Sequence, residues 1–490
     1  MRKTKRWHIV VSIVSLVIFG LIAMLYIQEL EKIDGIIAMT RQLMLMITFL
    51  FSFTLPCVLY SININNKKLE KVAYYDELCN IKNQNGFVKH ASEMLKNKKA
   101  NMAFAYIDID NFKAINNIFS YQYGNEVLIQ LAKILEEIFG EKAIVGRFSG
   151  DNFAVLAEYE EEADFTGKIN VIQEIANKRC HNEKELMLAI GIHFVKNNEE
   201  QFNQIFDKGN IAKHSVKHLD KSRYSIYDEE VGRLMQEEDT LIEEIKKAIK
   251  QMDFDVYYQP KFDFATKRIM ASEALIRWEH KEHGFISPVK FIPVAEKTHL
   301  IVGIGHFVFE RVCSDIQNWI SMGIKPFPVS VNFSRIEILQ GDMIEFIEKT
   351  VKKYDVSYEL LEIEITETIA VSDYEKIEMT LNEIKRLGMT ISIDDFGAGY
   401  SSLGCLQKFN VDTLKIDRSF IMDLENNKRG NNILKGMIDL SKKLELKTIC
   451  EGIETQEQMK MLEMLDCDYG QGFIFARPMK ESEFRKKLLE

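Results

Sequence analysis

The chain has little cysteine and little proline, with seven of each among 490 residues. The cysteines fall singly, without a Cys-x-x-Cys pair or a cluster with histidine, which argues against a zinc site and against a disulfide framework. Positive charge is also in deficit, since 63 Lys and Arg against 73 Asp and Glu leave a net charge of −10. A general nucleic-acid binder needs a basic face to replace phosphate counterions, so we expect neither DNA nor RNA polymer as a partner.

Two long uncharged segments lie near the start of the chain. Residues 9–27 and 43–62 carry no charge, and each is long enough to cross a hydrocarbon core of roughly 30 Å as a helix. Basic residues before the first segment and after the second predict a membrane hairpin, residues 1–64, with both ends in the cytoplasm. The alternative is a cleaved signal peptide, although a small-x-small cleavage site is missing. We expect a multi-pass protein of the cell (inner, cytoplasmic) membrane whose remaining domains are cytoplasmic.

The middle of the chain, residues 65–228, has no proline and alternates strand-like runs with amphipathic helical patterns. Residues 103–109 and 143–148 predict strands, and residues 126–139 predict a helix. Residues 229–250 place apolar side chains on one helical face, with acids in the first half and lysines at the end. This pattern predicts an α/β domain followed by a connecting helix.

The last block, residues 251–490, contains seven strand-like runs that end in polar or acidic residues. The runs are 269–273, 329–332, 361–364, 390–394, 413–417, 447–451 and 468–471. Most are separated by a helix-length segment, which is typical of βα units that close into a TIM-like (β/α)8 barrel with the strand ends at one mouth. Oxygen ligands from Asp, Glu and Asn suit Mg²⁺ or Mn²⁺, and the adjacent Asp394 and Asp395 could bridge two such ions.

Eight short motifs follow one another through this block. They are Tyr257-Tyr258-Gln259-Pro260, Glu273-Ala274-Leu275, Val331-Asn332-Phe333-Ser334, Glu364-Ile365-Thr366-Glu367, Asp394-Asp395-Phe396-Gly397-Ala398, Leu414-Lys415-Ile416-Asp417, Glu451-Gly452-Ile453-Glu454 and Gln471-Gly472-Phe473. With these motifs in this order, residues 236–490 resemble the EAL family of cyclic-di-GMP phosphodiesterases. The resemblance implies a barrel that hydrolyses cyclic-di-GMP to linear pGpG with two Mg²⁺ or Mn²⁺ ions per site.

The resemblance also implies roles for individual residues. The implied metal ligands are Glu273, Asn332, Glu364, Asp394 and Asp395. Glu451 is implied as the general base or as the carboxylate that orients the attacking water, and Lys415 as a group that holds water and phosphate oxygens. Glu367 is implied to steady the loop 394–403, which lies near the family's dimer contact.

Four further residues are candidates for substrate binding. They are Gln259, Arg277, Asp417 and Gln471. Two of them have structural alternatives, because Asp417 could be an ordinary charged residue at a strand end and Gln471 a structural hydrogen-bonding group. The family commonly has threonine where this chain has Ala398.

Residues 74–228 resemble the GGDEF family of diguanylate cyclases, an α/β sandwich, but the defining turn is altered. It reads Ser149-Gly150-Asp151-Asn152-Phe153. Asp108 and Asp151 could still hold one metal, whereas Ser149 replaces a glycine that lets backbone approach phosphate. Asn152 removes a formal charge, and Asn125 stands at the family's guanine-reading aspartate. We therefore expect no cyclase activity. Asn116 could still help to bind a regulatory GTP, or the domain could be a dimerising scaffold without a ligand.

These observations predict a membrane-inserted, homodimeric cyclic-di-GMP phosphodiesterase with a degenerate cyclase-like domain. Two alternatives stay open from the sequence. The EAL-like block could be a catalytically silent cyclic-di-GMP receptor or a dimerisation module, or the protein could be a bifunctional cyclase and phosphodiesterase.

Overall fold

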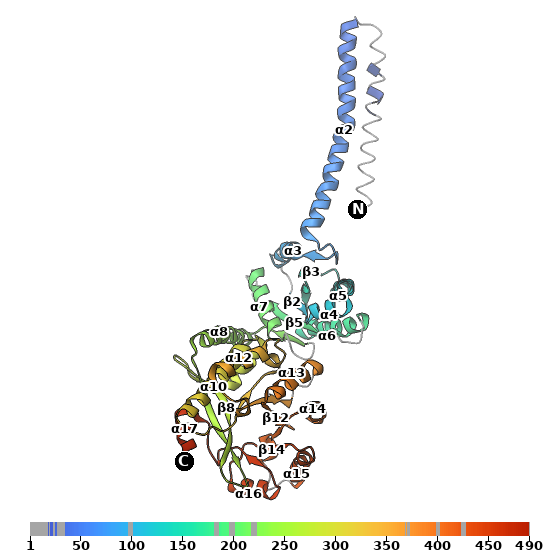
Figure 1. Cartoon of the computed structure of the whole chain (residues 1–490). Coiled ribbons are helices and arrows are strands. Elements are labelled where there is room, and N and C mark those ends of the chain that lie inside the picture. Colours follow the sequence, from blue (N-terminus) through green and yellow to red (C-terminus); the bar gives the residue numbers. More distant parts are fainter. Residues whose placement is uncertain are drawn as a thin grey trace. The chain divides into compact units, whose positions relative to one another are not determined.

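The computed structural model describes residues 18, 20–22, 25–26, 35–96, 101–180, 186–195, 201–216, 223–367, 369, 373–397, 402–422 and 428–489. The chain divides into two compact units, Met1–Met235 and Gln236–Glu490 (Figure 1). The division falls within α8 (Glu229–Gln251), so the predicted connecting segment forms a single helix.

A helix of 40 residues, α2 (Gly35–Tyr74), contains the second uncharged segment. Its apolar side chains are exposed, as for Leu50 at 61% and Phe51 at 66%. The Thr54 hydroxyl donates to the carbonyl oxygen of Leu50 at 2.8 Å, so this polar group is satisfied within the helix. An apolar surface of this kind is unfavourable in water and suits a lipid environment.

By length and composition, residues Met39–Tyr74 make up the one described helix that is long and apolar enough to cross a membrane. Most of the other predicted span, residues 9–27, lies outside the described residues. The membrane hairpin therefore stays a prediction.

The N-terminal unit is built on a six-stranded sheet with the strand order β1-β3-β4-β2-β5-β6. The strands are β1 (Lys82–Asn83), β2 (Asn101–Ile109), β3 (Ala143–Ser149), β4 (Asn152–Tyr159), β5 (Leu188–Val195) and β6 (Arg223–Ile226). The helices are α3 (Gln84–Lys96), α4 (Phe112–Phe119), α5 (Tyr121–Phe139), α6 (Glu162–Arg179) and α7 (Phe202–His214). One buried cluster joins the sheet to α5 and α6, and a second joins it to α3 and α7, so helices cover both faces as expected of an α/β sandwich.

In this unit, α7 lies unusually close to β5. A Cβ atom on Gly191 would be 2.0 Å from the carbonyl oxygen of Gly209 and 2.2 Å from the backbone nitrogen of Lys213, both on α7. A glycine at position 191 is therefore required for the helix backbone to reach the sheet.

Replacing Gly191 by alanine should lower the free energy of unfolding of the N-terminal unit by about 1–3 kcal/mol, because the new methyl group must push α7 away. As a control, Gly167→Ala on α6 should raise it by about 0.5–1 kcal/mol, since a Cβ there meets nothing within 4 Å. Urea unfolding followed by circular dichroism measures both variants. Similar effects of the two substitutions would contradict the close packing.

The C-terminal unit is a closed barrel of eight strands. They are β7 (Phe254–Asp263), β8 (Ile269–His280), β10 (Val329–Asn332), β11 (Leu361–Thr366), β12 (Thr390–Phe396), β13 (Thr413–Ile416), β14 (Lys447–Cys450) and β15 (Tyr469–Gly470). The short strands β9 (Gly284–Ile286) and β16 (Met479–Lys480) pair at its margin. The described helices around it are α9 (Pro288–Lys297), α10 (Ile301–Ser321), α11 (Arg335–Ile338), α12 (Met343–Tyr354), α13 (Tyr374–Leu387), α14 (Ser402–Lys408), α15 (Lys428–Lys443), α16 (Gln456–Met464) and α17 (Glu481–Leu489).

The prediction of a TIM-like barrel is correct in outline and wrong for one strand. Strands β8 and β10 to β15 pair in parallel, whereas β7 runs antiparallel to both of its barrel neighbours, β8 and β15. The reason is the connection between β7 and β8, which is only residues 264–268. A connection this short can form a hairpin but cannot provide the crossover that parallel strands need.

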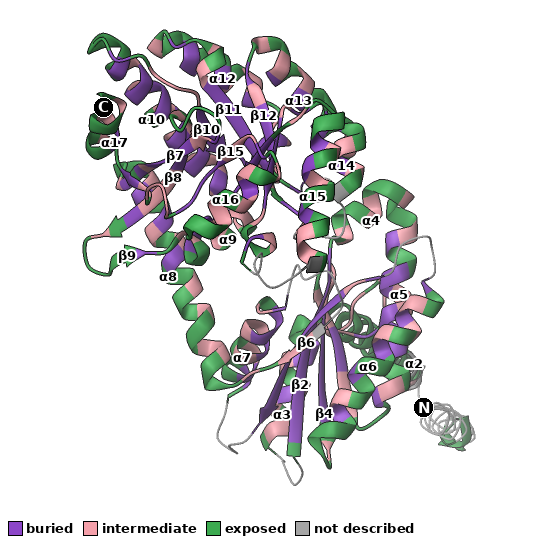
Figure 2. Ribbon diagram, turned by 90° about the horizontal axis from the view of Figure 1, so that it is seen from below, coloured by how far each residue is buried: buried purple, intermediate pink, exposed green. Residues whose placement is uncertain are grey.

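The barrel interior is polar, and the apolar core lies between the strands and the helices. Figure 2 shows the strands as buried and the outer faces of the helices as exposed. Alternate residues of β10 to β12, such as Ser330, Glu364 and Ser392, are fully buried, while their neighbours Ile363 and Ile391 belong to the hydrophobic cluster. Since side chains alternate along a strand, the polar set faces inward and leads towards one end of the barrel.

Candidate active site

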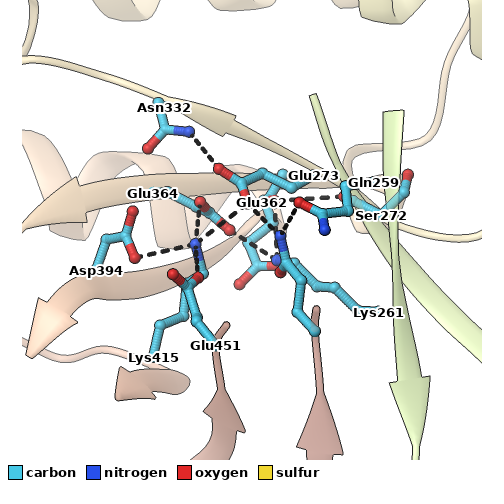
Figure 3. Close-up of polar contacts among 12 residues, drawn as sticks. Gln259, Lys261, Ser272, Glu273, Asn332, Glu362, Glu364, Asp394, Lys415 and Glu451 are labelled. Atoms are coloured by element: carbon cyan, nitrogen blue, oxygen red, sulfur yellow. Dashed lines mark hydrogen bonds and ion pairs between the residues drawn. The ribbon is translucent and has the colours of Figure 1, made fainter. Parts of the chain in front are cut away.

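The parallel register of the strands brings the predicted acids to the same mouth. Asn332 at the end of β10 lies beside Glu364 on β11, and Thr366 on β11 lies beside Asp394 on β12. The Asn332 side-chain amide donates to Glu273 Oε1 at 2.8 Å. Figure 3 shows these side chains converging from different strands on one region.

Lys415 on β13 stands at the centre of this group. Its Nζ lies 2.6 Å from Glu451 Oε1, 2.7 Å from Glu364 Oε2, 3.0 Å from Asp394 Oδ1 and 3.5 Å from Glu273 Oε2. Burial alone would lower the pKa of Lys415, but the surrounding carboxylates raise it well above its usual value. The lysine therefore carries its charge, and it joins four carboxylates from four different strands or strand ends.

A second buried lysine, Lys261 on β7, lies deeper in the barrel. Its Nζ lies 2.7 Å from Glu364 Oε1 and 3.5 Å from Glu362 Oε2, and it donates to Ser330 Oγ at 2.8 Å. Burial would raise the pKa of Glu364, yet Lys261 and Lys415 outweigh burial and lower it to about 2. Sequence reasoning missed Lys261 and Glu362, although both fall on the inward-facing positions of their strands.

Adjacent acids end β12, and the backbone there departs from a regular strand. Asp395 has a φ of 53°, in the left-handed region, and the pairing of β12 with β13 shifts between Ile393 and Phe396. Successive side chains of a regular strand point to opposite faces, so this irregularity lets Asp394 and Asp395 serve one site. Oxygens of Asp394, Asp395 and Glu451 lie within 4.8 Å of one another.

The donor set of this mouth fits divalent cations. Six acids share the region with two lysines; the acids are Glu273, Glu362, Glu364, Asp394, Asp395 and Glu451. Burial, followed by mutual repulsion, raises the pKa values of Glu273, Asp394 and Asp395, and burial raises that of Glu451 to about 8. Too little positive charge lies near these carboxylates to balance their ionised form, so the binding of a cation is favourable. Their oxygens are hard ligands, which suit Mg²⁺ or Mn²⁺.

The two predicted glutamines support the acids. Gln471 donates from Nε2 to Glu273 Oε2 at 2.6 Å and to Gln259 Oε1 at 3.2 Å, while Gln259 donates to the carbonyl oxygen of Ala476 at 3.2 Å. These contacts orient Glu273. They fit the structural hydrogen-bonding alternative for Gln471, and the substrate contacts of Gln259 and Gln471 stay predictions.

The other predicted residues lie around this group. Arg277 is half-buried on β8 and donates to the carbonyl oxygen of Ile276 at 2.8 Å. Asp417 follows β13, and its Oδ1 accepts a hydrogen bond from the backbone of Ser419 at 3.0 Å, which caps a short 3₁₀ turn. Proximity to Asp417 adds to the rise in the pKa of Asp395, so Asp417 also borders the mouth.

Glu367 joins the ends of two strands beside the acids. It is buried, and its Oε2 accepts a hydrogen bond from the backbone nitrogen of Gly397 at 2.9 Å. The Cys405 thiol donates to the Glu367 carbonyl oxygen at 3.4 Å, which ties α14 to the same point. Glu367 is thus placed to hold the start of the predicted loop, whose residues 398–401 lie outside the described part of the chain.

Family models match both units of the chain. A diguanylate cyclase GGDEF domain matches residues 73–223, and an EAL domain matches residues 242–478. The chain belongs to the GGDEF–EAL family. It is similar to the bifunctional diguanylate cyclase/cyclic di-GMP phosphodiesterase MucR of Pseudomonas aeruginosa, with 29% identity over 84% of this chain and 61% of MucR. It is also 28% identical to the cyclic di-GMP phosphodiesterase NbdA of the same species, over 84% of this chain and 53% of NbdA.

The GGDEF–EAL chain therefore spans little more than half the length of these curated relatives. Among solved structures, the MucR phosphodiesterase in complex with cyclic-di-GMP is 34% identical, with coverage of 50% of this chain and 99% of that chain and a TM-score of 0.48. The EAL enzyme Bd1971 in a cGMP-bound form is 26% identical, with coverage of 69% and 82% and a TM-score of 0.51.

In the GGDEF domain, the structure brings together part of the predicted site. Asp108 on β2 pairs directly with Asn152 on β4, and Asp151 precedes Asn152 in the turn. Asn116 on α4 packs against Gly124, where its Oδ1 would lie 1.9 Å from a Cβ atom, and Asn125 is exposed on α5. Asp108, Asp151 and Asn152 thus form one group, and Asn116 and Asn125 lie on neighbouring helices.

Replacing Lys261 by methionine should lower the free energy of unfolding of the EAL barrel by about 3–5 kcal/mol, because Glu362 would stay buried without its cation and Glu364 would keep only Lys415. Lys267→Met is the control; it removes an exposed ion pair with Glu463 and should cost at most about 1 kcal/mol. Urea unfolding followed by the fluorescence of Trp278 and Trp319, both buried in the barrel, measures each variant. Equal losses would mean that the buried pair contributes no more than a surface pair.

Proposed function

We propose that the EAL domain hydrolyses cyclic-di-GMP to linear pGpG. The observation that carries this proposal is the complete set of acids around Lys415 at the mouth of the barrel. The names of the related MucR and NbdA, which include cyclic di-GMP phosphodiesterase, support the substrate.

Two divalent cations would fit this mouth. Glu273, Asn332, Glu364 and Asp394 would hold one, and Asp394 and Asp395 would hold the other. When bound, such ions lower the pKa of a coordinated water and balance the charge of the phosphate. Gln471, which donates to Gln259 as well, holds Glu273 in place, and Lys261 holds Glu364, so these ligands are fixed before substrate arrives.

The residues of the chain then act on water and phosphate. Glu451 accepts a proton from the attacking water, whose oxygen forms a bond to one phosphorus as the bond from that phosphorus to the 3′ oxygen breaks. The 3′ oxygen takes up a proton from solvent, and the opened ring leaves as pGpG. Lys415 fixes the positions of Glu364, Asp394 and Glu451 through its three short contacts, and its positive charge attracts the phosphate of the substrate.

Glu451→Gln should reduce turnover by about 10²–10⁴-fold and leave binding of cyclic-di-GMP largely unchanged, because the amide cannot accept the proton but keeps the shape of the side chain. Turnover is measured as pGpG released with Mg²⁺ or Mn²⁺, and binding by calorimetry in the presence of Ca²⁺. Glu457→Gln, at an exposed position on α16, is the matched control and should retain full activity. Tight binding without hydrolysis by the unsubstituted protein would favour the silent receptor.

We further propose that the protein is an integral membrane protein anchored through its N-terminal hairpin, with both domains cytoplasmic, and that it acts as a homodimer with a regulatory GGDEF domain. The exposed apolar surface of α2 supports the anchoring. Comparing hydrolysis with and without GTP tests the regulation.

Placing arginine at Leu16 and Leu21 of the first segment as well as at Leu50 and Leu55 should release the protein from membranes. Each arginine at the centre of a span costs about 2.5–3.5 kcal/mol, so neither half of the hairpin would stay inserted. The unsubstituted protein should stay in the pellet after extraction with alkaline carbonate, and the variant should move to the supernatant. Exchanging the same residues for isoleucine should change nothing. Release of the unsubstituted protein by carbonate would contradict the anchoring.

A further inference from the structure

Two of the seven cysteines lie beside each other in the EAL barrel, outside the group of acids at its mouth. Cys450 is the last residue of β14, and Cys467 lies in the connection between α16 and β15. Their Sγ atoms are 3.5 Å apart, and both side chains are buried in an apolar cluster with residues of α15 and α16. The proposed hydrolysis uses neither thiol, so the pair is free for another role.

The two thiols face each other because hydrogen bonds join the strand to the connection. Asp468 Oδ2 accepts hydrogen bonds from the backbone nitrogen and the hydroxyl of Thr448, each at 2.9 Å. Thr448 precedes Cys450 by two residues and shares its face of β14, while Asp468 directly follows Cys467. The short distance between the two sulfurs therefore comes from ordered contacts on both elements.

Cys467 is the more reactive thiol of the two. Its hydrogen bond with Cys450 outweighs burial and lowers the pKa of the Cys467 thiol. Its neighbours Met464 and Asp466 are exposed, and Asp466 has a φ of 60°, so a short irregular segment separates this thiol from solvent. A small oxidant such as a peroxide reaches Cys467 through a local opening of that segment, whereas Cys450 is fully buried.

We propose that Cys450 and Cys467 form a reversible disulfide in the presence of peroxide, and that this disulfide lowers the activity of the EAL barrel. The Cys467 sulfur attacks one oxygen of hydrogen peroxide, the O–O bond breaks, and the departing hydroxide takes up the thiol proton to leave as water. The Cys450 sulfur then attacks the Cys467 sulfur, the S–O bond breaks, and a second water leaves with the Cys450 proton. One peroxide is reduced by two electrons, and two thiols are oxidised.

A reversible disulfide of this kind differs from a structural disulfide framework. In a reducing cytoplasm, structural disulfides are rare, and those that form are usually transient and redox-sensing. The single spacing of the cysteines in the sequence therefore agrees with this proposal, because the two thiols meet only in the folded barrel.

The disulfide acts on the barrel mouth through Cys450. The two sulfurs must move about 1.5 Å closer to reach bonding distance. Glu451 directly follows Cys450, and the Cys450 carbonyl oxygen accepts a hydrogen bond from the backbone nitrogen of Gln471 at 2.9 Å. Glu451 is the proposed base, and Gln471 orients Glu273. A misplacement of about 1 Å can lower a rate by about 10²-fold, so we expect slower turnover.

The effect on turnover rests on the proposed hydrolysis of cyclic-di-GMP, whereas the disulfide itself does not. Mass spectrometry of the full-length protein tests the disulfide after treatment with hydrogen peroxide and blocking of the remaining thiols with iodoacetamide. Trypsin places Cys450 in the peptide 448–460 and Cys467 in the peptide 461–480. We expect these peptides to be linked after oxidation and separated by dithiothreitol. Absence of the linked pair would overturn the proposal.

The release of pGpG by the same samples tests the regulation. Peroxide should lower the turnover of the unsubstituted protein by about 10–10²-fold, and dithiothreitol should restore it. Cys450→Ala should keep the basal turnover and lose the sensitivity to peroxide, and Cys467→Ala answers the same question if the first variant does not fold. Cys313→Ala, which removes a buried thiol on α10, is the matched control and should stay sensitive.

The outcomes separate this proposal from the proposed function. A linked pair with unchanged turnover would overturn the regulatory role, and so would equal inhibition of the unsubstituted protein and Cys450→Ala. No turnover by the reduced protein would contradict the hydrolysis, and the linked peptides would still decide whether the disulfide forms.

Discussion

The structure of the EAL barrel depends on balancing charge where water is largely absent. The ammonium group of Lys415 lies between Glu273, Glu364, Asp394 and Glu451, which come from different strands or strand ends. Coulomb interactions strengthen as the dielectric constant falls, so one buried lysine can hold several carboxylates together that would otherwise repel one another. Lys261 repeats the arrangement one layer deeper and fixes Glu364 from its other side.

Both domains contain buried carboxylates whose negative charge must be balanced, and the balance differs between them. In the barrel mouth, six acids face two lysines, and the raised pKa values of the uppermost acids mark a deficit of positive charge that divalent cations can fill. In the GGDEF domain, Asn152 lowers the negative charge beside Asp108, and Lys213 supplies a cation from within the chain. The altered turn and the buried lysine are therefore consistent with each other.

Much of the fold and the site could be predicted from the sequence. The strand-like runs at 329–332 and 390–394 correspond to β10 and β12. Asn332 and Asp394 at their ends lie at the barrel mouth as expected, where Asn332 donates to Glu273 and Asp394 lies near Glu273 and Glu364. Strand β7 was not among the predicted runs, and its antiparallel direction needed the structure, because hydrophobic pattern does not encode the direction of a strand. The supporting roles of Gln259 and Gln471 also needed the structure, since a glutamine at a strand end has the same appearance in a sequence whether it contacts a ligand or Glu273.

The sequence by itself determined the two domains, their families and the acids of the barrel mouth other than Glu362, because motif order and strand spacing are properties of the chain. Only the tertiary structure revealed that three lysines are buried and that each is paired with oxygen atoms of acids or amides. Lys415 stood in a motif, but Lys261 and Lys213 are ordinary charged residues in the sequence, and they become significant through partners 101 and 61 positions away. A lysine becomes buried and paired only when strands and helices that are distant in the sequence come together and exclude water from its ammonium group.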